Sequence, residues 1–166
     1  EFTKYPGKSA CGNVLCDVHF GGSFKKTLLI SSRDPEGAPE DVIIFRNLFL
    51  LPADPMIEVR AVNGLAIVNN MLDAATRAVG IMPEGFGVYN VEIRDNYIGT
   101  SAGGVYFDKT GASGGNISVH DNYLWSPDGV VALGQDYTGI SVNNDYFVLG
   151  SGNAVFMAFA KAADIG

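Results

Sequence analysis

The chain has 166 residues and a net charge of −7, with 47% hydrophobic and 17% charged residues. This composition excludes a disordered chain, and the 11 scattered basic residues argue against nucleic acid, which requires Lys and Arg clustered at phosphates. The longest apolar runs are short and interrupted, so we expect no membrane span. One domain covering residues 1–166 is therefore expected.

Residues 1–40 show the weakest pattern and are expected to form an irregular N-terminal coil or cap. Within them, residues 18–20 and 28–30 are candidates for strands of one early coil, and residues 31–40 for an acidic loop. Cys11 and Cys16 are the only cysteines. A short-loop disulfide and two small buried side chains both remain open. A zinc site that includes His19 would need a fourth ligand, which the sequence does not mark.

Residues 41–159 carry the pattern that decides the fold. Five segments have apolar residues at their first, third and eighth positions and Asn or Asp at the sixth: 42–49, 65–72, 91–98, 117–124 and 140–147. They follow one another at spacings of 23, 26, 26 and 23 residues, and such a period is typical of a solenoid. The alternation within each segment predicts a strand whose apolar residues face the core.

The sixth position is expected to make the bend between two strands, because asparagine tolerates the left-handed conformation. Stacked side chains there would also form a hydrogen-bonded ladder, with the members Asn47, Asn70, Asn96, Asn122 and Asp145. A second strand repeat keeps the same phase at residues 57–59, 79–81, 105–107, 130–132 and 155–157. Three short strands per turn predict an all-β, right-handed parallel β-helix of about five to six coils.

Residues 90–98 (NVEIRDNYI) and 116–124 (NISVHDNYL) resemble repeats of the pectin-lyase-like superfamily of single-stranded right-handed β-helices. The resemblance covers residues 41–159 and leaves residues 160–166 as a terminal segment of an incomplete coil. It implies an extracellular, cell-surface or virion-surface protein whose partner is a polysaccharide, although no signal peptide is recognisable. A leucine-rich horseshoe would need consensus leucines and helices, and a sandwich would not keep a constant phase.

The residue after the ladder position is expected to face solvent, and in successive coils it is Leu48, Met71, Tyr97, Tyr123 and Tyr146. Stacked tyrosines offer apolar area and hydroxyl groups to a sugar, so Tyr97, Tyr123 and Tyr146 are candidate substrate-binding residues. A ladder that only stabilises the strands and a protein interface are the alternatives. Trp125 is expected to lie outward or in a loop, where it would bind a sugar or cover the loop.

The outward column of the second repeat lies on the sheet along which enzymes of the resembled superfamily commonly build their cleft. A uronate lyase needs a base, often Arg or Lys, and acidic residues that hold calcium against the substrate carboxylate. The resulting candidates are Asp108, Lys109 and Arg60 for catalysis, with Tyr106 and Glu58 for substrate binding. Calcium stays an optional cofactor, because no column of stacked acids is found and no metal ligands are assigned.

Two observations weigh against this catalytic hypothesis. Arg60 and Asp108 would lie about 10 Å apart, which is a long separation for joint action on one sugar. Glu58 and Asp108 could just reach the spacing of an inverting hydrolase, but nothing else supports that pair. Solvated surface is the alternative for all of these residues. His120 and Asp121 are adjacent, but we expect them to point apart on a solvated turn.

Two functions are left open by the sequence. One is a protein that acts on or binds polysaccharide, in the lineage of lyases, hydrolases or epimerases. The other is a structural β-helical shaft or adhesin segment, such as part of a phage tailspike, that forms a homo-oligomer through outward apolar columns.

Overall fold

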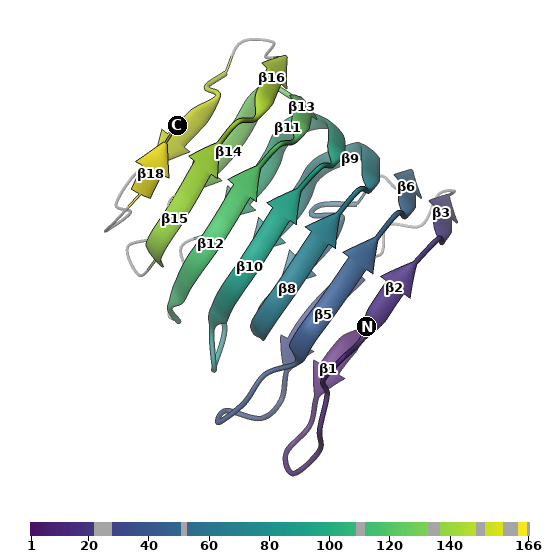
Figure 1. Cartoon of the computed structure of the whole chain (residues 1–166), viewed down its shortest axis with the longest axis vertical. Coiled ribbons are helices and arrows are strands. Elements are labelled where there is room, and N and C mark those ends of the chain that lie inside the picture. Colours follow the sequence, from purple (N-terminus) through teal and green to yellow (C-terminus); the bar gives the residue numbers. More distant parts are fainter. Residues whose placement is uncertain are drawn as a thin grey trace.

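The computed structural model describes residues 1–21, 28–50, 53–108, 112–132, 137–148, 152–157 and 163–165. These residues contain strands and no helix, and the strands stack in parallel into a right-handed β-helix. Successive coils lie side by side from the N-terminal end to the C-terminal end of the molecule (Figure 1). The predicted fold class is confirmed.

Each coil contributes strands to three faces. The first face is a sheet of seven strands, β2 (Val14–Cys16), β5 (Glu40–Phe45), β8 (Val62–Val68), β10 (Val88–Arg94), β12 (Gly114–His120), β15 (Tyr137–Asn143) and β18 (Ala163–Ile165). The second face consists of β3 (His19–Gly21), β6 (Leu48–Leu50), the start of β9 (Met71–Ile81), the start of β11 (Tyr97–Phe107), β13 (Tyr123–Trp125) and β16 (Tyr146–Val148). The third consists of β1 (Phe2–Lys4), β4 (Leu28–Ser32), β7 (Ile57–Val59), the ends of β9 and β11, β14 (Asp128–Ala132) and β17 (Val155–Met157).

The strand register follows the phase of both sequence repeats. On the first face, Val91 pairs with Leu65 on one side and with Ile117 on the other. On the third face, Val79 pairs in the same way with Ile57 and Val105. The short strands β3 and β4 continue this stacking into the N-terminal region, because they pair in parallel with β6 and β7.

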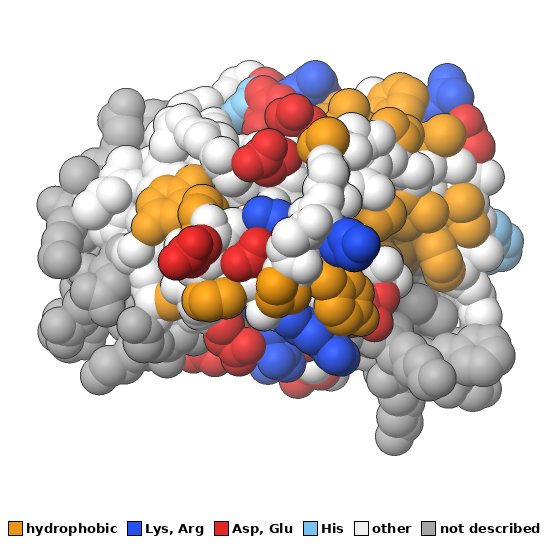
Figure 2. Space-filling model, turned by 90° about the horizontal axis from the view of Figure 1, so that it is seen from below, with side chains coloured by type: hydrophobic (Ala, Val, Ile, Leu, Met, Phe, Trp, Pro, Cys, Tyr) orange, Lys and Arg blue, Asp and Glu red, His pale blue; other side chains and the backbone are white. Residues whose placement is uncertain are grey.

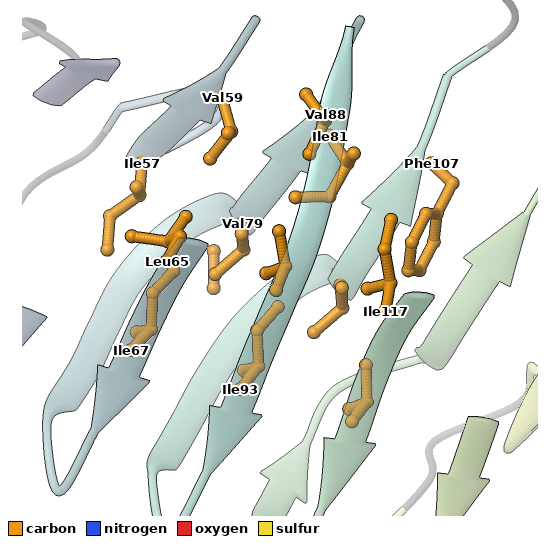
Figure 3. Packing of buried hydrophobic residues seen from close by; sticks show 14 of the residues in the cluster. Ile57, Val59, Leu65, Ile67, Val79, Ile81, Val88, Ile93, Phe107 and Ile117 are labelled. Carbon is orange, nitrogen blue, oxygen red and sulfur yellow. The ribbon is translucent and has the colours of Figure 1, made fainter. Parts of the chain in front are cut away.

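The core is a set of apolar columns that run along the helix axis. Side chains of the first and third faces point toward one another across the interior (Figure 3). Ile44, Ile67, Ile93 and Val119 form one such column and are fully buried. Each of these side chains contributes about 1.5–3 kcal/mol by leaving water, so the columns hold the coils together.

The bend between the first and second faces is made one residue earlier than the sequence predicts. The left-handed backbone conformation belongs to the residue before the ladder position, with φ between 53° and 56° at Asp17, Arg46, Asn69, Asp95, Asp121 and Asn144. The prediction that the asparagine column itself adopts this conformation is therefore wrong. These asparagines are buried, and their side chains are occupied in hydrogen bonds.

The asparagine ladder itself is confirmed. In each step, the Oδ1 atom of one asparagine accepts from the backbone N–H and from the side-chain Nδ2 of the asparagine one coil earlier. The distances from Asn70 to Asn96 are 2.9 and 3.0 Å, and both distances from Asn96 to Asn122 are 3.0 Å. Asp145 extends the ladder by accepting both bonds from Asn122, at 2.8 and 2.9 Å.

The two cysteines are neither bonded to each other nor buried, so both sequence-based alternatives are wrong. Cys11 lies opposite Glu40, and Cys16 pairs with Phe45 on the same face. Both thiols are free and exposed.

No helix among the described residues has the length and apolar character that crossing a bilayer would require.

Candidate functional site

The outward column of the second face forms a continuous stack of aromatic rings. The centroids of Tyr97 and Tyr123 are 5.4 Å apart with an angle of 11° between the ring planes. Those of Tyr123 and Tyr146 are 5.2 Å apart at 21°. Because Tyr123 lies between two parallel rings, it offers its edge and hydroxyl to a partner, and a sugar cannot lie flat on it.

The stack continues toward the N-terminal end as an apolar surface. We define the aromatic strip as Leu48, Met71, Tyr97, Tyr123 and Tyr146, which pair in register along the second face. Met71, Tyr123 and Tyr146 are 41%, 40% and 63% exposed. The outward orientation predicted for these side chains is confirmed, and their role in binding stays a prediction.

A hollow lies beside the strip at Trp125, the side chain of which is 56% exposed. The hollow has a volume of about 210 Å³ and is lined by Thr100, Trp125, Ser126, Pro127 and Val148. The buried hydroxyl of Thr100 has no hydrogen-bond partner among the described residues. The hollow is therefore bordered by an exposed aromatic ring, while the Thr100 hydroxyl beneath it is closed to solvent.

A carboxylate lies over the glycine that pairs with Trp125. Asp73, Gly99 and Trp125 are in register on three successive coils. A Cβ atom at Gly99 would lie 2.7 Å from Asp73 Oδ1 and 3.3 Å from Tyr97 Cε1, so the absence of a side chain lets the carboxylate lie over the glycine. We call Asp73, Thr100, Trp125, Pro127 and Val148 the Trp125 site.

Sequence reasoning missed Asp73 and Thr100 as members of this site. The available signal was the gap that Gly99 leaves in an outward column. That signal can be recognised only when the register between coils is known, because Asp73 and Trp125 are 52 residues apart in the sequence.

On the third face, Arg60 is held by two carboxylates. Its guanidinium forms a short bond with Glu58 and a second one of 3.3 Å with Glu84. The hydrogen bond that Arg60 donates to Glu58 raises the pKa of Arg60, so the guanidinium stays protonated and is not available to accept a proton. Glu58, predicted to bind substrate, is thereby engaged within the protein.

Asp108, the other catalytic candidate that the structure describes, is not brought next to Arg60. Val59, Ile81 and Phe107 are in register, which places Asp108 two coils from Arg60 with one coil between them. Lys109 lies outside the described residues. The catalytic role of these three residues stays a prediction.

Tyr106 is covered on its ring face. The guanidinium of Arg77 lies 4.6 Å from the centroid of this ring, and its Nε atom is 2.6 Å from Asp54 Oδ1. Burial, followed by the charge of Asp108, raises the pKa of the Tyr106 hydroxyl. The arrangement is that of a stacked cation, with the ring face already occupied.

Charges of both signs are mixed on the surface of the molecule seen from below (Figure 2). No broad area of one sign appears on this view. Within the described part of the chain, no group of three or more His, Cys, Asp or Glu side chains is arranged to hold a metal ion.

His120 and Asp121 do not point apart, so that expectation is wrong. His120 Nδ1 lies 2.7 Å from Asp121 Oδ2, and its Nε2 atom lies 3.3 Å from Glu92 Oε1. Arg94 Nε approaches the other oxygen of Glu92 at 3.1 Å. These partners, Asp121 first, raise the pKa of His120. Arg94 also binds Asp95 at 2.6 Å, so the cluster is a surface ion-pair network in which three carboxylates share Arg94 and His120.

Comparisons with known proteins add no relative. No protein-family model matches the chain, and neither a curated protein nor a solved structure does.

Proposed function

We propose that the chain is a polysaccharide-binding β-helix that holds its ligand on the second face, at the Trp125 site. The observation that carries the proposal is the exposed indole of Trp125 beside a hollow of about 210 Å³. Sugar rings present an apolar C–H face and a rim of hydroxyls. An exposed aromatic ring with a few fixed polar groups is complementary to both.

Binding is favoured over bond cleavage by the state of the candidate catalytic groups. Arg60 is neutralised by Glu58 and Glu84, and Asp108 is two coils away from it. A general base must lie within hydrogen-bond reach of the proton that it removes, with a pKa suited to the task. The same proposal includes a location outside the cell or on a surface, where polysaccharides are met.

The charge of the protein favours neutral over acidic glycans. The net charge is −7, and the Asp73 carboxylate lies over Gly99, the residue that pairs with Trp125 in the preceding coil. A carboxylate accepts hydrogen bonds from sugar hydroxyls but repels the carboxylate of a uronate. A uronate polymer, the usual ligand of lyases, would need bridging cations.

The proposal is tested by depletion of the protein from solution by insoluble polysaccharides. Cellulose, xylan, mannan and β-1,3-glucan are compared with gels of pectate and alginate. We expect retention on at least one neutral polymer and a loss of ten-fold or more in affinity for Trp125→Ala. Tyr5→Ala is the matched control, since Tyr5 is another exposed aromatic residue (46%) and lies outside the second face. Undiminished retention of Trp125→Ala would contradict the assignment.

The aromatic strip also supports a second candidate function, which is a shaft that associates with copies of itself. Met71 and Tyr146 give this strip exposed apolar area along several coils. Self-association through the strip would be seen by light scattering as a concentration-dependent mass. It would be lost in a Met71→Lys/Tyr146→Lys double variant, and a monomer at every concentration contradicts the shaft.

A further inference from the structure

A second hollow lies on the first face and is caused by two small residues on β8. It has a volume of about 280 Å³. Gly64 and Ala66 lie at its floor, between Asp41 and Ile43 of β5 on one side and Asn90 and Glu92 of β10 on the other. We call this hollow the β8 trough. Because the outward positions of β8 hold small residues while both neighbouring strands hold longer ones, the trough is one coil wide.

The wall on the β10 side carries polar groups that are fixed before any ligand arrives. Asn90 Nδ2 donates to Asn63 Oδ1 at 2.7 Å, and Asn90 Oδ1 accepts from Asn116 Nδ2 at 2.7 Å. The amide keeps one further proton and one further lone pair for a ligand. Glu92 is held by Arg94 at 3.1 Å and by His120 at 3.3 Å.

The wall on the β5 side combines an apolar and an acidic group. Ile43 lies between the inward residues Val42 and Ile44, so its side chain points outward and is 41% exposed. Asp41 has a left-handed backbone with φ of 52°, and its Oδ1 atom would lie 3.1 Å from a Cβ atom at Gly64. The trough thus offers an aliphatic surface facing preorganised hydrogen-bonding groups.

We propose that the β8 trough is a binding site for a neutral oligosaccharide, separate from the Trp125 site. β8 pairs with β5 on one edge and with β10 on the other. An extended peptide therefore cannot add to the floor as a strand, and recognition passes through side chains. A sugar chain supplies the distributed hydroxyls that Asp41, Asn90 and Glu92 can bind and a C–H face for Ile43.

The charges of the trough select among glycans. Glu92 is paired with Arg94 and His120, which also bind Asp95 and Asp121, and Asp41 is a further carboxylate at the opposite wall. An anionic glycan would be repelled by Asp41, and a neutral one would not. Two sites on different faces would let one β-helix bind two glycan chains, which raises its avidity for a polymer without new contacts.

The test is a two-dimensional ¹⁵N–¹H NMR titration with cellotetraose, xylotetraose and mannotetraose, alongside tetragalacturonate. We expect a neutral tetrasaccharide to shift the backbone amides of Gly64, Ala66 and Asn90, and the same shifts to persist in Trp125→Ala. Ala66→Trp, which fills the trough, and Ala66→Lys, which narrows it, should each lower the affinity obtained from the Gly64 and Asn90 shifts ten-fold or more. Ser141→Trp is the control, because Ser141 lies in the same outward column outside the trough.

The outcomes separate this site from the first one. Shifts confined to Trp125 and its neighbours would leave the proposed function standing and overturn the trough. Trough shifts that survive both Ala66 substitutions unchanged would also overturn it. An absence of shifts at Gly64, Ala66 and Asn90 with all three neutral probes contradicts the trough whatever happens at Trp125.

Discussion

Removal of one internal member of the asparagine ladder should destabilise the protein more than any exposed amide would. Asn96 is 2% exposed, and its side chain serves three partners. Its Oδ1 atom accepts from the backbone N–H of Asn70 at 2.9 Å and from Asn70 Nδ2 at 3.0 Å. Its Nδ2 atom donates to the Ile67 carbonyl at 2.8 Å and to Asn122 Oδ1 at 3.0 Å.

The magnitude follows from the groups that Asn96→Ala leaves without a partner. The buried N–H of Asn70 and the Ile67 carbonyl each lose a bond that water cannot replace. A buried group left unsatisfied costs about 1–3 kcal/mol, so we expect a loss of about 4 kcal/mol in the free energy of unfolding. Asn122 Oδ1 still accepts from the backbone N–H of residue 96, so the loss of its second donor adds little to the destabilisation.

The assay is urea denaturation followed by circular dichroism, with amide hydrogen exchange at Asn70 as a local readout. Asn63→Ala is the matched control, because Asn63 accepts a single exposed hydrogen bond, from Asn90. That variant should lose less than about 1 kcal/mol. Equal stability of Asn96→Ala and Asn63→Ala would refute the claim that the buried ladder holds the coils in register.

Three other substitutions test the packing and the charges. Burial raises the pKa of Asp145 above 3.8, so folding favours its protonated form and stability falls as the pH rises through that raised pKa. Asp145→Asn should therefore be more stable by about 1–2 kcal/mol at neutral pH, with a smaller difference near pH 4 in urea denaturation. A Cβ atom at Gly104 would lie 2.6 Å from Leu124 and 2.8 Å from a backbone carbonyl, whereas one at Gly103 would meet nothing closer than 3.8 Å. Gly104→Ala should lower stability by about 1–3 kcal/mol in thermal denaturation and Gly103→Ala should not, so equal melting temperatures would contradict the packing. His120 has a pKa raised above 6.5, so its contribution is complete below 6.5 and is lost as the pH rises through the raised value. His120→Gln should remove this dependence, worth under about 1 kcal/mol, and an unchanged pH profile would argue against the ion-pair network.

The fold could be predicted from the sequence because a solenoid repeats one local rule many times. The alternation around Ile93 and Val119 gives the strand period, and the constant phase gives the pairing between coils. The ladder was predictable for the same reason. The position of the bend was not, since Asp95 and Asn96 are both compatible with a left-handed backbone, and only the burial of Asn96 decides between them.

The candidate sites were less predictable, because each depends on what a neighbouring coil lacks. The Trp125 site requires that Gly99 lies opposite Trp125, and the β8 trough requires that Ala66 lies between Ile43 and Glu92. Neither arrangement leaves a mark within one segment of sequence. Conversely, Arg60 and Glu58 looked like separate functional candidates, but they are partners in an ion pair.

The most direct test of the proposed function uses the fluorescence of Trp125, the single tryptophan of the chain. Its emission reports on the Trp125 site alone. We predict that a neutral tetrasaccharide that is retained by the protein shifts this emission to shorter wavelengths and protects it from quenching by acrylamide, whereas tetragalacturonate does neither. An emission and a quenching constant that stay unchanged at saturating concentrations of every neutral probe would contradict the assignment of this face as a glycan-binding surface.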